Sequence, residues 1–171
     1  DTGIRHQTHD VIDLRFTMDI LESGNVGIYG SRDGDGDDEV SVLINTTSGE
    51  KMILDFWNNP ANFGDRLTLT FGTQFAEILG RPVRVRLSQS EIYLATEDGT
   101  YQSVRKSTPS VINCSNTAYI FGCYDWNTTH PAPPQGIKFN ELTVTREGEL
   151  YRHYLPALTP GGEAGLYDTV P

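Results

Sequence analysis

Apolar and polar residues alternate along much of the chain. Between residues 12 and 20 every even position is apolar, while the odd positions from Asp13 to Asp19 are polar. Because successive side chains of an extended strand point to opposite faces, this pattern predicts a strand with one buried and one solvated face. Similar alternation or a short run predicts further strands at Val26–Ser31, Val40–Ile44, Met52–Phe56, Leu67–Phe71, Val83–Leu87, Ile92–Thr96, Tyr101–Val104, Thr117–Cys123, Ile137–Thr145 and Leu150–Leu155.

Turn-forming residues separate these runs. Ser23-Gly24-Asn25, Ser48-Gly49, Asp98-Gly99 and Glu147-Gly148 each fit a tight connection between antiparallel strands. Only residues 73–79 favour one or two helical turns. Many short strands at this spacing indicate an all-β antiparallel sandwich or barrel, in one domain that spans residues 1–171.

Charge narrows the set of partners. The 13 Lys and Arg residues against 23 Asp and Glu residues give a formal net charge of −10. An acidic domain repels a phosphate backbone, so we expect no nucleic-acid partner.

No stretch approaches the roughly 20 consecutive apolar residues of a membrane-spanning helix, so we expect no membrane insertion. Sulfated or uronic-acid polymers should bind poorly unless calcium or a local cluster of arginines offsets the repulsion.

Five segments in chain order carry a family resemblance. They are Asp1–Ile4 (DTGI), Glu91–Tyr101 (EIYLATEDGTY), Thr117–Phe121 (TAYIF), Phe139–Pro156 (FNELTVTREGELYRHYLP) and Gly165–Asp168 (GLYD). Together they resemble the concanavalin A-like lectin/glucanase superfamily, and more narrowly the laminin-G-like domains of secreted and surface proteins of gut bacteria. The resemblance implies a two-sheet antiparallel jelly-roll sandwich, secretion or display at the cell surface, and covalently linked neighbouring domains in a larger protein.

The acid pattern of the superfamily's glucanases is absent from the sequence. Glycoside hydrolysis needs two carboxylates across one sugar, and those enzymes carry them on one strand as Glu-x-Asp-x-x-Glu. The nearest approach is Glu141, Glu147 and Glu149, but the turn at Gly148 puts Glu141 and Glu149 on different predicted strands. We therefore expect no catalytic residues.

One acidic segment has the oxygen ligands of a possible calcium site. Asp33, Asp35 and Asp37 alternate with glycine between two predicted strands, which fits either a calcium loop or a charged turn. The EF-hand spacing fails, because Ile44 occupies the twelfth position from Asp33. Calcium is therefore a candidate cofactor, with those three aspartates as its ligands.

The cysteines and histidines leave alternatives open. Cys114 and Cys123 either form a disulfide, which would fit an oxidising export compartment, or are two apolar thiols. The four histidines and two cysteines show no zinc-ligand spacing, and we expect the histidines to be surface or half-buried strand residues.

Two aromatic segments fit a sugar, whose apolar C–H faces and ring of hydroxyls suit an aromatic platform beside polar side chains. In the first, alternation turns Trp57 away from the core side, beside Asn58 and Asn59. The second is the polar loop that contains Tyr124, Asp125, Trp126, Asn127 and His130. The alternative for each tryptophan is that it covers the core as a packing residue and binds no ligand. Arg84 and Arg86, which point outward, either contact sugar carboxylates or form a solvated strand face.

These features favour a non-catalytic carbohydrate-binding module of a secreted or surface bacterial protein, with a polysaccharide or glycan as its partner. The first alternative is a protein-contacting adhesion or structural domain, for example on a surface protein or phage tail. The second is a glycosidase or lyase with an unrecognised site.

Overall fold

The chain is an all-β protein, as the alternation predicts. The computed structural model describes residues 2–19, 25–32, 38–45, 51–57, 68–70, 78–97, 101–105, 111–120, 124–125, 128–129 and 136–171. Its strands are β1 (Asp10–Met18), β2 (Asn25–Arg32), β3 (Glu39–Asn45), β4 (Lys51–Trp57), β5 (Thr68–Thr70), β6 (Pro82–Leu87), β7 (Glu91–Thr96), β8 (Tyr101–Arg105), β9 (Tyr119–Ile120), β10 (Tyr124–Asp125), β11 (Thr128–Thr129), β12 (Ile137–Arg146), β13 (Glu149–Leu158) and β14 (Ala164–Asp168). Among the described residues, no helix is long and apolar enough to cross a membrane.

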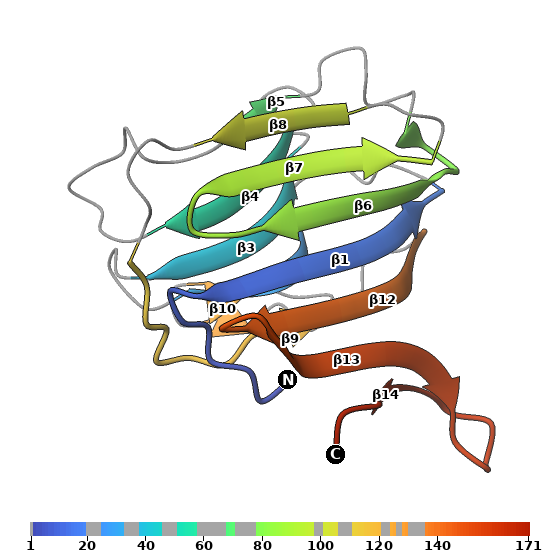
Figure 1. Cartoon of the computed structure of the whole chain (residues 1–171). Coiled ribbons are helices and arrows are strands. Elements are labelled where there is room, and N and C mark those ends of the chain that lie inside the picture. Colours follow the sequence, from blue (N-terminus) through green and yellow to red (C-terminus); the bar gives the residue numbers. More distant parts are fainter. Residues whose placement is uncertain are drawn as a thin grey trace.

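The strands form two main antiparallel sheets (Figure 1). The larger has seven strands in the order β14-β13-β12-β1-β6-β7-β8, and the smaller has five in the order β5-β4-β3-β2-β9. A separate two-residue ladder joins β10 to β11. In the larger sheet β1 therefore pairs with β12 on one side and β6 on the other, so it joins the first part of the chain to the last.

One hydrophobic core lies between the two sheets. Burial alternates along β1, where Ile12, Leu14, Phe16 and Met18 are buried as the pattern predicts. These side chains belong to the same buried cluster as apolar residues of β6 and β7 in the larger sheet and of β3 and β4 in the smaller one. Because each fully buried aliphatic or aromatic side chain stabilises the fold by roughly 1.5–3 kcal/mol, this shared cluster holds the sandwich together.

Within the predicted strand at Thr117–Cys123, β9 contains Tyr119–Ile120, Thr117 and Ala118 precede it, and residues 121–123 lie outside the described residues. The backbone that precedes β9 forms hydrogen bonds with the N-terminal segment instead of with β2. The amide of Cys114 donates to the carbonyl of His6 at 2.8 Å, and that of Ala118 donates to the carbonyl of Ile4 at 2.8 Å.

Three connections meet at one end of the larger sheet: the entry into β1, the β6–β7 turn and the β12–β13 turn (Figure 1). The predicted turn at Glu147-Gly148 is confirmed, and both residues adopt a positive φ, 52° and 87°. Glycine accepts that conformation without strain, so the turn is tight. These three connections position the candidate site.

Candidate functional site

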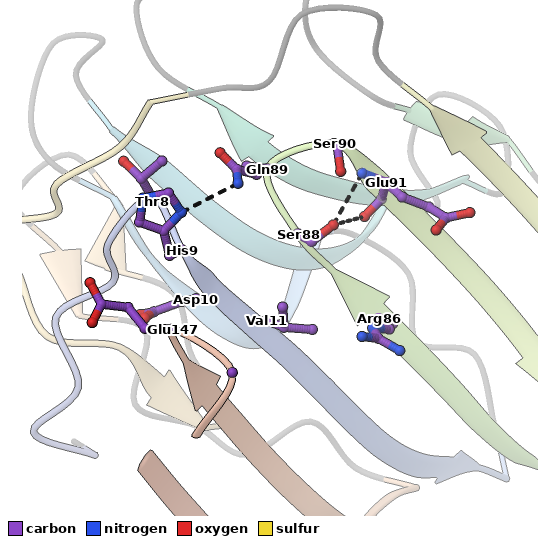
Figure 2. Close-up of a pocket in the computed structure, with 11 residues that line it drawn as sticks. Thr8, His9, Asp10, Val11, Arg86, Ser88, Gln89, Ser90, Glu91 and Glu147 are labelled. Carbon is purple, nitrogen blue, oxygen red and sulfur yellow. Dashed lines mark hydrogen bonds between the residues drawn. The ribbon is translucent and has the colours of Figure 1, made fainter. Parts of the chain in front are cut away.

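An open hollow of about 680 Å³ lies at this end of the larger sheet (Figure 2). Its base includes Val11 on β1 and Arg86 on β6, whose side chains lie on the sheet face away from the core. The residues that line it are Thr8, His9, Asp10, Val11, Arg86, Ser88, Gln89, Ser90, Glu91, Glu147 and Gly148. Most carry a hydroxyl, amide, imidazole, guanidinium or carboxylate group, so the hollow offers both donors and acceptors of hydrogen bonds.

Hydrogen bonds fix the β6–β7 side of the hollow. The backbone amide of Ser88 donates to the carbonyl of Glu91 at 3.0 Å, and the Ser88 hydroxyl donates to the same carbonyl at 2.9 Å. The Glu91 amide in turn donates to Ser88 Oγ at 3.1 Å. At the tip of this turn, the Gln89 side-chain amide donates to His9 Nδ1 at 3.4 Å and bridges to the entry of β1 (Figure 2).

Asp10 is one of the lining residues but lies on the buried side of β1 and is only 1% exposed. Arg146 donates from Nε to Asp10 Oδ1 at 2.7 Å and from Nη2 to Oδ2 at 3.0 Å. The Gln7 amide and His6 Nδ1 also reach Oδ2, at 3.0 Å and 3.2 Å. Burial by itself raises the pKa of Asp10, but the hydrogen bonds from Arg146, His6 and Gln7 outweigh it and lower the pKa to about 2.

His6 continues this network into the core. Its Nε2 lies 2.6 Å from the hydroxyl of Tyr29 on β2, and both residues are fully buried. Burial lowers the pKa of His6 and raises that of Tyr29, so the imidazole is neutral and the phenol keeps its proton. Since the ionised Asp10 can only accept, His6 Nδ1 carries the hydrogen and Tyr29 donates to Nε2. The network therefore ties β12 and β1 of the larger sheet to β2 of the smaller one.

The remaining carboxylates of the hollow differ in their partners. Glu91 accepts a hydrogen bond from Arg105 Nε at 2.8 Å. Glu147 is exposed on the β12–β13 turn, and no described residue forms an ion pair with it. Glu141 and Glu149 lie on β12 and β13, as predicted.

The structure describes the backbone of part of each predicted aromatic segment, and that part lies in or beside the smaller sheet. Trp57 is the last residue of β4 and pairs with Glu39 of β3, whereas Tyr124 and Asp125 form β10, which lies against β2. Within the second segment, Tyr124 and Asp125 thus pair with Thr129 and Thr128 in a short ladder. The side chains of Trp57, Tyr124 and Asp125, and all of Asn58, Asn59, Trp126, Asn127 and His130, lie outside the described residues, so this predicted sugar site stays a prediction.

The calcium and disulfide predictions also stay open. Asp33, Asp35, Asp37 and Cys123 lie outside the described residues. Cys114 is buried, with its Sγ 3.8 Å from the carbonyl oxygen of Asp38. Within the part of the chain that is described, no group of three or more His, Cys, Asp or Glu side chains could hold a metal ion.

Sequence reasoning missed most of the hollow and the whole buried network. The expectation that every histidine is a surface or half-buried strand residue is wrong for His6, which is fully buried before β1 begins. The spacing of His6 and Asp10 was the available local signal, but Arg146 lies 136 residues from Asp10 and no periodicity joins them. The outward direction of Arg84 and Arg86 was predicted and is confirmed.

Comparison of the chain with protein-family models, with curated proteins and with solved structures returned no match.

Proposed function

We propose that this domain is a non-catalytic carbohydrate-binding module, and that the hollow at the end of the larger sheet is a sugar site. The observation that carries the proposal is the composition of that hollow: a wide, open depression whose walls are dominated by hydrogen-bonding side chains. A polyhydroxylated ligand can exchange its water contacts for such groups, whereas an apolar ligand gains little there.

The walls are also preorganised. Ser88, Glu91, Gln89 and His9 are held by hydrogen bonds within the β6–β7 turn and across to β1. Ordering these side chains before the ligand arrives reduces the entropy lost on binding.

The electrostatics favour binding over hydrolysis. A glycosidase needs one carboxylic acid with a raised pKa as proton donor, beside a second carboxylate. Asp10 does not meet the requirement for a proton donor, because its pKa is lowered to about 2 and it is ionised at neutral pH. Glu91 is paired with Arg105. These partners support a binding role for the hollow.

Calorimetric titration of the domain against a panel of soluble polysaccharides tests the proposal. Gln89→Ala and Ser90→Ala each remove one polar contact from the rim and should weaken binding about threefold to tenfold. Asn140→Ala, at the other end of β12, is the matched control and should bind like the unmodified domain. If Trp57→Ala or Trp126→Ala abolishes binding while the rim variants leave it unchanged, the sugar site belongs to the aromatic segments. Absence of binding to every polysaccharide contradicts the proposal.

We also propose that the sandwich is a jelly roll of the concanavalin A-like kind, in a secreted or surface-displayed bacterial protein. The antiparallel pairing of β1 with both β12 and β6, which joins the two ends of the chain in one sheet, supports this architecture.

A protein-contacting adhesion domain is the second candidate, and one observation favours it. The outer part of the β13–β14 hairpin carries exposed apolar residues, with Leu158 72%, Tyr167 61% and Leu166 43% exposed. Exposed apolar groups that gather on one element favour contact with another macromolecule. Leu158→Ser with Leu166→Ser should leave polysaccharide binding unchanged if the hollow is the functional site.

A further inference from the structure

Arg86 is an exposed cation of the hollow, and no partner for it occurs among the described residues. Its side chain lines the base, and none of the described residues forms an ion pair or hydrogen bond with it. Most basic residues of the larger sheet are engaged: Arg15 with Glu141, Arg105 with Glu91, Arg146 with Asp10 and Arg152 with Asp168. In a chain with 23 acidic against 13 basic residues, an unpaired arginine on this sheet calls for an explanation.

The carboxylate on the strand position that pairs with Arg86 already forms an ion pair with another arginine. Asp13 is its Cα partner on β1, but Arg84 donates from Nε to both Asp13 oxygens, at 2.8 Å and 3.0 Å, and from Nη2 to Oδ2. Arg84 also lies over the ring of Tyr93, 5.9 Å from its centroid. Asp13 is therefore neutralised by Arg84, and the guanidinium of Arg86 remains available to the hollow.

The acids that line the hollow do not cancel this charge. Asp10 is paired with Arg146 and Glu91 with Arg105. Glu147 lies on the opposite side, on the β12–β13 turn (Figure 2). The hollow thus has a cationic side at Arg86 and an acceptor side at Glu147, with the neutral side chains of Gln89 and Ser90 on its rim.

We propose that the hollow selects a carboxylated sugar, a uronic acid residue, whose carboxylate forms a two-point pair with Arg86 while its hydroxyls face Gln89, Ser90 and Glu147. This inference rests on the carbohydrate-binding function proposed above and names its ligand class. The planar fork of a guanidinium matches both oxygens of a carboxylate, and such charge-assisted bonds are about twice as strong as neutral ones.

The net charge of −10 led to the expectation that uronic-acid polymers bind poorly, and the proposal revises that expectation for a uronate held next to Arg86. At physiological ionic strength charges are screened over about 8 Å, so the distant acidic surface acts weakly on a group held in the hollow. A uronate carries one negative charge for each sugar and suffers less repulsion than a multiply sulfated sugar, which favours the carboxylate as the ligand group.

The test uses oligosaccharides of galacturonic, glucuronic, mannuronic and guluronic acid, each with its neutral counterpart and its methyl ester, in calorimetric titrations of the whole chain. We expect at least one uronate to bind about tenfold or more tightly than its neutral counterpart and its ester. Arg86→Gln should bring the uronate to the affinity of the neutral sugar. Arg86→Lys should restore only part of the preference, since lysine keeps the charge and loses the fork.

Arg5→Gln is the matched control, because it removes one exposed positive charge outside the hollow and should leave the preference intact. Equal binding of uronate and neutral sugar, or a preference that survives Arg86→Gln, overturns the inference while the carbohydrate-binding function stands. A sulfated oligosaccharide that binds as tightly as the uronate overturns the choice of carboxylate. If no sugar binds, the proposed function falls with the inference.

Discussion

Four side chains from distant parts of the chain form the buried network beneath the hollow. His6, Asp10, Tyr29 and Arg146 each have at least one hydrogen-bond partner within it, and Asp10 is held ionised while His6 is held neutral. A buried charge is tolerated only when it is paired and hydrogen-bonded. The network therefore makes stability sensitive to proton concentration at two identifiable groups.

Stability should fall in two stages as the pH is lowered. His6 has a pKa in the folded chain below its ordinary value of 6.5, so the unfolded chain binds a proton first and stability decreases below about pH 6.5. Asp10 has a pKa of about 2 when folded against 3.8 ordinarily, so its contribution of about 2 kcal/mol is complete above about pH 5 and is lost as the pH falls towards 2.

Urea unfolding between pH 8 and pH 2.5 measures both stages. His6→Gln should flatten the first stage, whereas His9→Gln, at an exposed residue before β1, should preserve it. A wild-type unfolding free energy that stays constant from pH 8 to pH 5 would count against a neutral, buried His6.

Removing one hydroxyl from the network gives a second residue-scale prediction. Tyr29→Phe leaves His6 Nε2 buried without its hydrogen-bond donor, and should cost about 1–3 kcal/mol of unfolding free energy. Tyr167→Phe removes a hydroxyl from an exposed ring of β14 and should change the free energy by less than about 0.5 kcal/mol. Equal effects of the two substitutions in urea unfolding would refute the role assigned to the Tyr29–His6 bond.

At the scale of elements, alternation predicted the strands well because it reports directly which face is buried. β1, β6 and β7 alternate in burial along their length, with the core side as predicted. The pattern was less informative at Thr117–Cys123, where the backbone of Cys114 and Ala118 pairs with the N-terminal segment instead of extending the strand. Pairing between distant segments leaves no periodic trace in either of them.

The β2–β3 pairing depends on one glycine. Gly30 has a φ of 154°, and a Cβ built there would lie 2.6 Å from the carbonyl oxygen of Val40, which is backbone and cannot move aside cheaply. Gly30→Ala should therefore destabilise the domain by more than about 2 kcal/mol. Gly165 in β14 has open space around its Cβ position, so Gly165→Ala should be close to neutral. Thermal unfolding of both variants decides the point, and a neutral Gly30→Ala would disprove the tight approach of the two strands.

For the whole molecule, the sequence predicted the all-β class and the outward arginines but not the hollow. Sheet faces follow from local alternation, so Arg86 could be assigned to the solvated side of its strand. The hollow arises where the entry to β1 meets two turns that follow β6 and β12, and that meeting depends on the strand order of the sheet. Local sequence patterns do not report which distant strands pair, so they do not predict this strand order. Ser88 and Gln89 therefore had no feature that distinguished them from other residues of a turn.

The central claim is that the hollow, rather than any other surface, receives a sugar. Amide chemical-shift mapping of the isotope-labelled domain, titrated with the tightest-binding oligosaccharide from the calorimetric panel, tests this claim most directly. We predict that the largest shifts fall on Thr8–Val11, Ser88–Glu91 and Gly148, and that the β13–β14 hairpin stays unperturbed. Shifts concentrated on Tyr124–Thr129, on Trp57 or on β14, with the hollow unchanged, would contradict it.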